Sequence, residues 1–138
     1  MTVETFIDTN VLAYAFDSES VDKAAIAQRI LAQAEFIIST QVLSELYVTL
    51  TRKLTKPVPS HVAQQVIDEL RVLPVMSISH SLVASAIDTS IRHQLSYWDA
   101  LIIETAAFAG CHTLLTEDLN TQAVISGVSI VNPFDLPE

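Results

Sequence analysis

The chain has 138 residues, a length that fits one domain with a sizeable buried core, and we expect a single domain over residues 1–138. Its formal net charge of −9 argues against a protein that holds nucleic acid through a broad basic face. Hydrophobic residues make up 50% of the chain and the mean hydropathy is +0.40, so we expect a partner to cover part of the surface, as in a homodimer.

The composition also indicates where in the cell the protein is expected and which kinds of binding site it can contain. A membrane-spanning helix needs roughly 20 apolar residues in a row, and the apolar runs here are shorter, so we expect no membrane association. Cys111 is the single cysteine, which excludes an internal disulfide, favours the cytoplasm and predicts a small buried hydrophobe. The two glycines, Gly110 and Gly127, cannot form a glycine-rich phosphate loop, so Walker and Rossmann nucleotide sites are excluded.

The first apolar run ends in an acid. Val3 to Asp8 is predicted to be a strand buried on both faces, followed by Thr9, Asn10 and an apolar helical pattern. In a parallel sheet, ligands bind beyond the carboxyl ends of the strands. Asp8 therefore lies where a site is expected.

Apolar periodicity and end signals predict the elements that follow. Ser20, Thr40, Ser60 and Ser96 are candidate N-caps, Ser79 can start a helix and Gly110 can end one, so helices are expected at 21–34, 41–53, 60–70, 79–93 and 97–109. Buried strands are expected at 36–38, 72–78, 113–116 and 129–131. This alternation predicts a three-layer α/β/α sandwich with a mainly parallel central sheet.

Three further acids lie near the same edge, and each has an ordinary structural alternative. Glu45 lies at the margin of the apolar stripe of its helix and could be a solvated glutamate, although Val48 and Thr49 offer it no cation. Asp99 has capping-box spacing from its N-cap and could serve the helix end, a role compatible with function. Asp118 directly follows a strand and could be a turn residue.

Together the four carboxylates predict a metal site. Carboxylates in one pocket raise one another's pKa unless a cation lies among them, and the chain has seven Lys and Arg, none beyond Arg92. Oxygen ligands select Mg²⁺ or Mn²⁺, whereas the four scattered histidines show no zinc spacing and are expected to be surface or structural residues. The natural work of such a site is phosphodiester hydrolysis.

Four segments in order resemble the motifs of PIN-domain ribonucleases, most of all the VapC-like toxins of toxin-antitoxin modules. They are Phe6-Ile7-Asp8-Thr9-Asn10-Val11-Leu12, Leu43-Ser44-Glu45-Leu46, Leu95-Ser96-Tyr97-Trp98-Asp99-Ala100-Leu101-Ile102 and Leu115-Thr116-Glu117-Asp118-Leu119. The resemblance implies a PIN-like fold, an RNA substrate, a cognate antitoxin and a homodimer. It makes Asp8, Glu45, Asp99 and Asp118 the catalytic and metal residues, supported by Asn10 and Thr116. Thr121-Gln122 departs from the segment that many relatives carry there, which affects substrate contacts rather than metal ligands.

The expected protein is thus a Mg²⁺- or Mn²⁺-dependent endoribonuclease in which Asp8 and Asp99 are the principal ligands. Glu45 and Asp118 would complete the site directly or through water. Two alternatives stay open: a catalytically silent PIN-like module that binds RNA or protein, and an aspartyl-phosphate phosphotransfer domain. The second ranks lower because such domains need a late lysine, and the lysines here are Lys23, Lys53 and Lys56.

Overall fold

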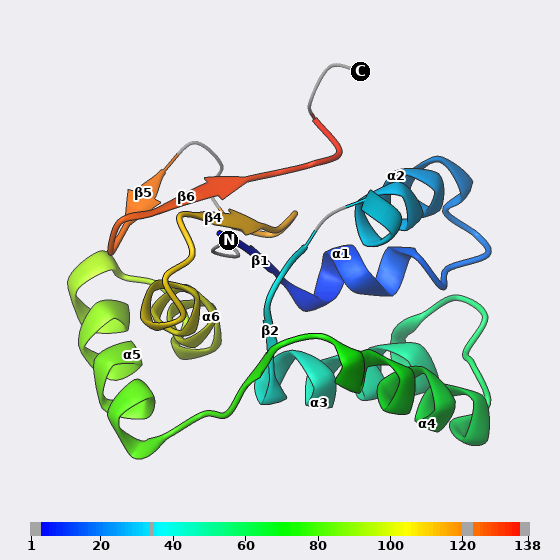
Figure 1. Ribbon diagram of the computed structural model, residues 1–138, viewed down its shortest axis with the longest axis horizontal. Coiled ribbons are helices and arrows are strands. Elements are labelled where there is room, and N and C mark those ends of the chain that lie inside the picture. The colour runs from blue at the N-terminus through cyan, green and yellow to red at the C-terminus, as the bar shows by residue number, and fades with distance from the viewer. Residues whose placement is uncertain (1–3, 34, 120–122, 136–138) are drawn as a thin grey trace.

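The computed structural model describes residues 4–33, 35–119 and 123–135, and Figure 1 shows how they are arranged. The strands are β1 (Thr5–Ile7), β2 (Ile38–Ser39), β3 (Val75–Met76), β4 (Thr113–Leu115), β5 (Val124–Ile125) and β6 (Val128–Val131). The α-helices are α1 (Thr9–Tyr14), α2 (Val21–Gln33), α3 (Thr40–Val48), α4 (Ser60–Glu69), α5 (His80–His93) and α6 (Tyr97–Phe108). A π-helical turn (Thr49–Lys53) follows α3 and a 3₁₀ turn (Leu70–Val72) follows α4.

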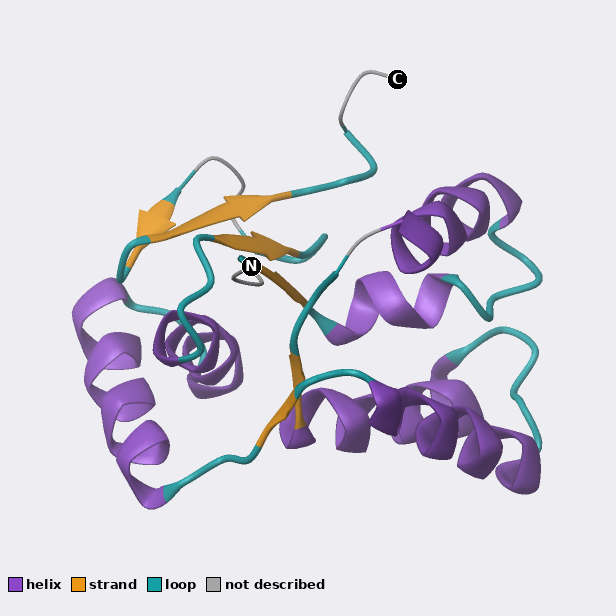
Figure 2. Cartoon of the chain, in the orientation of Figure 1, coloured by secondary structure: helices purple, strands orange, loops and turns teal. Residues whose placement is uncertain are grey.

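The strands form a mainly parallel arrangement around β1. β1 pairs with β4 and β4 with β6, both in parallel, and β5 pairs antiparallel with β6. On the other side, β2 and β3 pair in parallel, and a bridge between Phe6 and Ile37 joins them to β1, giving the order β3-β2-β1-β4-β6-β5 (Figure 2). With helices flanking the sheet, this confirms the predicted α/β sandwich and places the first strand at its centre.

The core explains why β1 and α6 are so apolar. Phe6 and Ile7 are fully buried, as a strand covered on both faces requires. α6 packs against β4 and β6, and α5 packs along α6 (Figure 1). The apolar sequence of α6 indicates an interior helix, which is correct for its middle but wrong for its ends, because Trp98 and Phe108 are 60% and 70% exposed.

Several predicted helix ends are confirmed. Ser79 and Ser96 are the N-caps of α5 and α6, since their hydroxyls accept from the amides of Leu82 and Asp99. Gly110 has a φ of +82° and ends α6 with a hydrogen bond from the Cys111 amide to the Ala106 carbonyl at 2.9 Å. Cys111 is buried, and burial raises the pKa of its thiol to about 11. In the described parts of the chain, no helix is long and apolar enough to cross a membrane.

Other predicted details are wrong. The N-cap of α3 is Ser39, whose hydroxyl accepts from the Val42 amide at 3.2 Å, whereas Thr40 is the first helical residue and accepts from the Ile78 amide. Pro59, not Ser60, is at the N-cap of α4.

Two strand predictions also need correction. The third strand is shorter than 72–78, because a 3₁₀ turn takes up the residues after α4 and leaves only Val75–Met76 to pair. β5 was not predicted at all. It pairs with β6 across Ser126 and Gly127, which have φ values of +52° and +78°, as a tight hairpin turn requires.

Candidate active site

Asp8 is held at the point where β1 becomes α1. It is the N-cap of α1, and its Oδ1 accepts from the Thr9 amide at 2.7 Å. Its Oδ2 accepts from the Thr116 hydroxyl at 2.8 Å, which ties it to the end of the neighbouring strand β4. Both carboxylate oxygens are therefore fixed by local and long-range hydrogen bonds.

Burial of Asp8 makes its charge costly. The side chain is 7% exposed, and burial raises the pKa of its carboxyl to about 6. The hydrogen bonds from Thr116 and Thr9 lower that pKa, while the negative charges of Glu45 and Asp99 raise it further. Burial, more than the neighbouring charges, thus makes the ionised form of Asp8 costly.

Glu45 lies in the second turn of α3 and is linked to Asp8 through Thr9. The Thr9 hydroxyl donates to Glu45 Oε1 at 3.0 Å, while the Thr9 amide donates to Asp8. Gln41 Nε2 donates to Glu45 Oε2 at 3.4 Å and to the Trp98 carbonyl at 3.1 Å. Gln41 therefore connects α3 to the start of α6, although its buried Oε1 finds no donor among the described residues.

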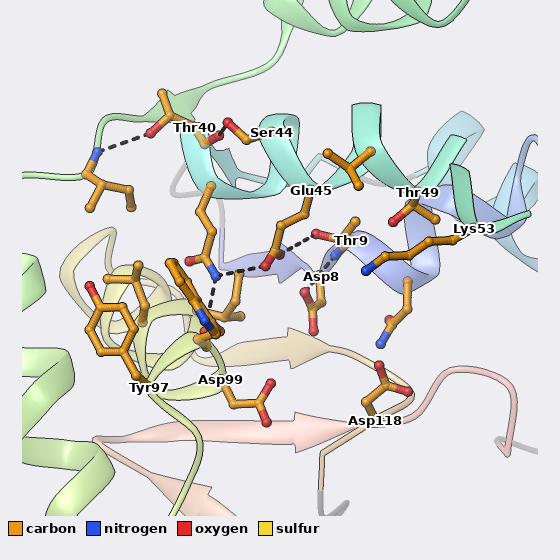
Figure 3. Close-up of a pocket in the computed structure, with 17 residues that line it drawn as sticks. Asp8, Thr9, Thr40, Ser44, Glu45, Thr49, Lys53, Tyr97, Asp99 and Asp118 are labelled. Atoms are coloured by element: carbon orange, nitrogen blue, oxygen red, sulfur yellow. Dashed lines mark hydrogen bonds between the residues drawn. The ribbon is translucent and has the colours of Figure 1, made fainter. Parts of the chain in front are cut away.

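Asp99 serves the helix end with its backbone and leaves its side chain for the site. Its amide donates to the Ser96 hydroxyl at 3.1 Å, which is the capping bond of α6. No hydrogen bond to the Asp99 carboxylate occurs within the described ranges, so the reciprocal half of a capping box is missing. Figure 3 shows this carboxylate in the same pocket as Asp8 and Asp118.

The segment after β4 carries Asp118, and two supporting residues hold it. Asn10 Nδ2 donates to the Thr116 hydroxyl at 3.4 Å, and Asn10 Oδ1 accepts from the Glu117 amide at 3.3 Å. Asn10 thereby fixes the backbone that presents the exposed Asp118 to the pocket. Thr121-Gln122, the predicted departure from the family pattern, lie outside the described residues.

Glu117, the acid next to Asp118, is directed elsewhere. It accepts hydrogen bonds from the Tyr14 hydroxyl at 2.7 Å and from the Lys23 ammonium. Burial raises the pKa of the Glu117 carboxyl, but these two hydrogen bonds and the Lys23 charge lower it by more, so the net pKa is lowered. Lys23 and Glu117 are thus paired with each other outside the pocket.

One open pocket of about 930 Å³ brings all the predicted carboxylates together. Its wall includes Asp8, Glu45, Asp99 and Asp118 (Figure 3), with Asn10 also on the lining. Thr116 does not line the pocket but donates a hydrogen bond to Asp8. No group of three Asp, Glu, His or Cys side chains in the described ranges is close enough to ligate one ion as it stands. The structure therefore supplies the donor atoms in one place without a preformed ligand set.

The donor chemistry fits a hard divalent cation. Every acidic group on the pocket wall is a carboxylate, and no histidine or cysteine lines it. Such all-oxygen sites suit Mg²⁺ or Mn²⁺ rather than zinc. A divalent ion would also offset the cost of burying the Asp8 charge and its repulsion by Glu45 and Asp99.

Lys53 is a pocket residue that the sequence did not indicate. After α3, the Leu54 amide donates to the Thr49 carbonyl at 3.2 Å, the spacing of a π-helical turn. A π-turn takes more residues than an α-turn, so it rotates Lys53 toward the side that carries Glu45. The ammonium reaches toward the carboxylates in Figure 3. The sequence placed none of the seven Lys and Arg at this edge, and the structure places Lys53 there, although one ammonium faces four carboxylates.

The raised pKa of Asp8 leads to a stability prediction. The metal-free folded protein binds the Asp8 proton up to about pH 6, whereas the unfolded chain releases it near 3.8, so stability is lost as the pH rises between these values. Asp8→Asn removes this cost and should stabilise the fold at pH 7 by up to about 3 kcal/mol, with little difference below about pH 4. Urea unfolding in EDTA at pH 4 to 7 measures this.

The exposed Asp68, at the end of α4, provides the matched control for that experiment. Asp68→Asn removes a carboxylate of the same type from open surface and should leave the free energy of unfolding within about 0.5 kcal/mol at every pH. An Asp8→Asn variant no more stable than the parent at pH 7 would contradict the account of a buried, repelled carboxylate.

Comparisons with known proteins agree with this geometry. No curated protein matches the chain. Among solved structures, a toxin-antitoxin complex from Klebsiella pneumoniae is similar with a TM-score of 0.72 and 21% identity, covering 96% of this chain and 100% of that one. VapC20 of Mycobacterium tuberculosis, a toxin that cleaves the sarcin-ricin loop, has a TM-score of 0.69 and 20% identity, covering 83% and 90%. FitAcB from Neisseria gonorrhoeae has a TM-score of 0.68 and 16% identity, covering 96% and 99%.

These likenesses concern the fold, because the identities are low. Membership of a family is shown by the sequence, because the PIN domain matches residues 5–126, from β1 to the β5–β6 turn. This span contains every candidate site residue. The chain belongs to the PIN domain family.

Proposed function

We propose that this chain is a cytoplasmic, Mg²⁺- or Mn²⁺-dependent endoribonuclease and the toxin of a toxin-antitoxin pair. The observation that carries the proposal is the single pocket at the carboxyl edge of the sheet, lined by Asp8, Glu45, Asp99 and Asp118. The PIN domain match and the fold shared with VapC-type toxins support the assignment to RNA hydrolysis.

Each residue has a role that its contacts support. Asp8 and Asp99 would be the principal metal ligands, and Glu45 and Asp118 would complete the site directly or through water. The bound ion would stabilise charge on the phosphate and lower the pKa of a water. Thr9 and Thr116 orient the Asp8 carboxylate, and Asn10 holds the backbone next to Asp118.

A partner is part of the proposal. The similar Klebsiella pneumoniae structure is a toxin-antitoxin complex, which supports an antitoxin for this chain as well. Exposed apolar side chains such as Ile87 and Ile91, one turn apart on α5, support a homodimer. Sedimentation of the purified 15.1 kDa chain at micromolar concentration should show a dimer or a complex, and a compact monomer would contradict both.

A catalytically silent PIN-like module is the second candidate, because no three acidic side chains in the described residues form a ready ligand set. Calorimetric titration with Mn²⁺ separates the two candidates: the enzyme should bind the ion with loss of binding in Asp8→Asn, and a silent module should bind none. The aspartyl-phosphate alternative does not fit the family to which the chain belongs.

The proposed activity is tested with purified protein and a single-stranded RNA. We expect cleavage in Mg²⁺ or Mn²⁺, none in EDTA, and recovery when either ion is returned in excess. Ca²⁺ should restore little, because it is larger and less demanding of octahedral geometry. Full activity in EDTA, or no cleavage of any RNA with either ion, would contradict the proposal.

A further inference from the structure

Trp98 is exposed in an unusual place. It lies in the first turn of α6, directly before Asp99, and is 60% exposed although the following residues Ala100 and Leu101 are buried. It also lines the pocket that contains the carboxylates. A large aromatic side chain left open beside a charged site offers a flat apolar surface to a ligand.

Two contacts hold Trp98 in this position. Its carbonyl accepts from Gln41 Nε2 at 3.1 Å, so its backbone is tied to α3. The Tyr97 ring meets the indole edge to face, with ring centroids 5.0 Å apart and planes at 70°. The indole is therefore supported by neighbours while most of its surface is free.

Lys53 lines the same pocket as Tyr97 and Trp98. Figure 3 shows Tyr97 on one side of the carboxylates and Lys53 on the other. Lys53 is exposed and makes none of the ion pairs found in the described part of the chain, unlike Lys23 and Lys56. Its ammonium is available for an anion that reaches the pocket.

The charge of the chain makes such contacts necessary for binding a polyanion. A net charge of −9 argues against binding of nucleic acid through a broad basic face, so we expect affinity to come from local contacts. Stacking of a base on an aromatic side chain is worth about 1–3 kcal/mol. In a duplex both faces of a base are already covered by its neighbours, so only an unstacked base can use Trp98.

We propose that Trp98 is a base-stacking platform next to the cleavage site and that Lys53 binds a backbone phosphate of the same RNA. This inference rests on the proposed ribonuclease function and adds two substrate-binding residues to it. Trp98 and Lys53 bind and position the substrate.

The test uses the fact that Trp98 is the only tryptophan in the chain. A 12-nucleotide single-stranded RNA is titrated into the 138-residue chain in Ca²⁺, and the integrity of the RNA is checked on a gel. Stacking should quench the tryptophan emission to saturation, with the same midpoint as the anisotropy of a fluorescein-labelled copy of that RNA. The same RNA annealed to its complement should leave the emission nearly unchanged.

Variants separate stacking from general surface effects. Trp98→Ala should weaken RNA binding by about 5- to 150-fold and Trp98→Phe much less, because stacking is worth about 1–3 kcal/mol and a phenyl ring retains part of it. Phe108→Ala, at the other end of α6 and similarly exposed, should bind as the parent does. Lys53→Gln should lower the salt slope of binding by about 0.7, and Lys53→Arg should not. Arg71→Gln, on the 3₁₀ turn, is the matched charge control.

Three outcomes would overturn the inference: RNA that binds without changing Trp98 emission, a Trp98→Ala variant that binds as the parent does, or equal quenching by the duplex. A concentration-dependent emission shift without RNA would also overturn it, since a second copy would then cover Trp98. The proposed function is judged separately. If RNA is cleaved but its binding does not change the Trp98 emission, only the proposed stacking role of Trp98 is rejected. If RNA quenches the emission but is not cleaved with any metal ion, only the proposed ribonuclease activity is rejected.

Discussion

Asp8→Asn and Asp99→Asn are each expected to reduce RNA cleavage by at least about a thousandfold. Stabilisation of transition-state charge by a bound ion is worth several kcal/mol, and each 1.36 kcal/mol changes the rate tenfold. Both swaps keep the shape of the side chain, so the fold should survive, and Asp8→Asn should be more stable at neutral pH because it removes a buried, repelled charge. Initial cleavage rates and melting temperatures measured together test this.

The other two carboxylates are expected to give smaller losses of activity, which makes the experiment more specific. Glu45→Gln and Asp118→Asn should cause large but incomplete losses, because these carboxylates complete the site rather than dominate it. Asp68→Asn, exposed on α4, should cleave at the parental rate. If both Asp8→Asn and Asp99→Asn retained cleavage, the assignment of the site would be wrong.

RNA cut by this protein is expected to carry a 5′-phosphate and a 3′-hydroxyl. Attack by the substrate's own 2′-hydroxyl needs a general base and a general acid of near-neutral pKa, most often two histidines. The four histidines lie on α4, at the two ends of α5 and before β4, and none lines the pocket. The lack of a histidine pair therefore favours hydrolysis by water, which leaves the 2′-hydroxyl uninvolved.

A single 2′-deoxy nucleotide at the cleaved position therefore distinguishes the two routes. Hydrolysis by water should slow only modestly, whereas attack by the 2′-hydroxyl becomes impossible. Mass spectrometry of the fragments identifies the ends directly. A 2′,3′-cyclic phosphate would overturn the mechanism even if the protein proved to be a ribonuclease.

The alternation of strands and helices could be predicted because its signals are local. Ser79, Ser96 and Gly110 mark helix ends through hydrogen bonds to backbone groups a few residues away. The prediction of an N-cap failed where the neighbouring residue could make the same hydrogen bond to the helix end. Ser39, one residue before Thr40, caps α3 and leaves the Thr40 hydroxyl to accept from Ile78.

The edge on which the acids gather could also be predicted, because parallel strands end on the same side of a sheet. Asp8 and Asp118 follow β1 and β4, which pair in register from Thr5 with Thr113 to Ile7 with Leu115. What the strand ends could not indicate is orientation. Glu117 is one residue nearer to β4 than Asp118, yet contacts with Tyr14 and Lys23 turn it out of the pocket.

The sequence by itself thus determined the fold class, the family and the candidate acids, because repeating apolar patterns and residues at strand ends depend on short stretches of chain. Only the tertiary structure decided how the site is built. The burial of Asp8, the link from Thr9 to Glu45 and the open indole of Trp98 depend on elements far apart in the sequence. Lys53 reaches the pocket because a π-helical turn rotates the chain after α3, and no local pattern of residues announces that turn.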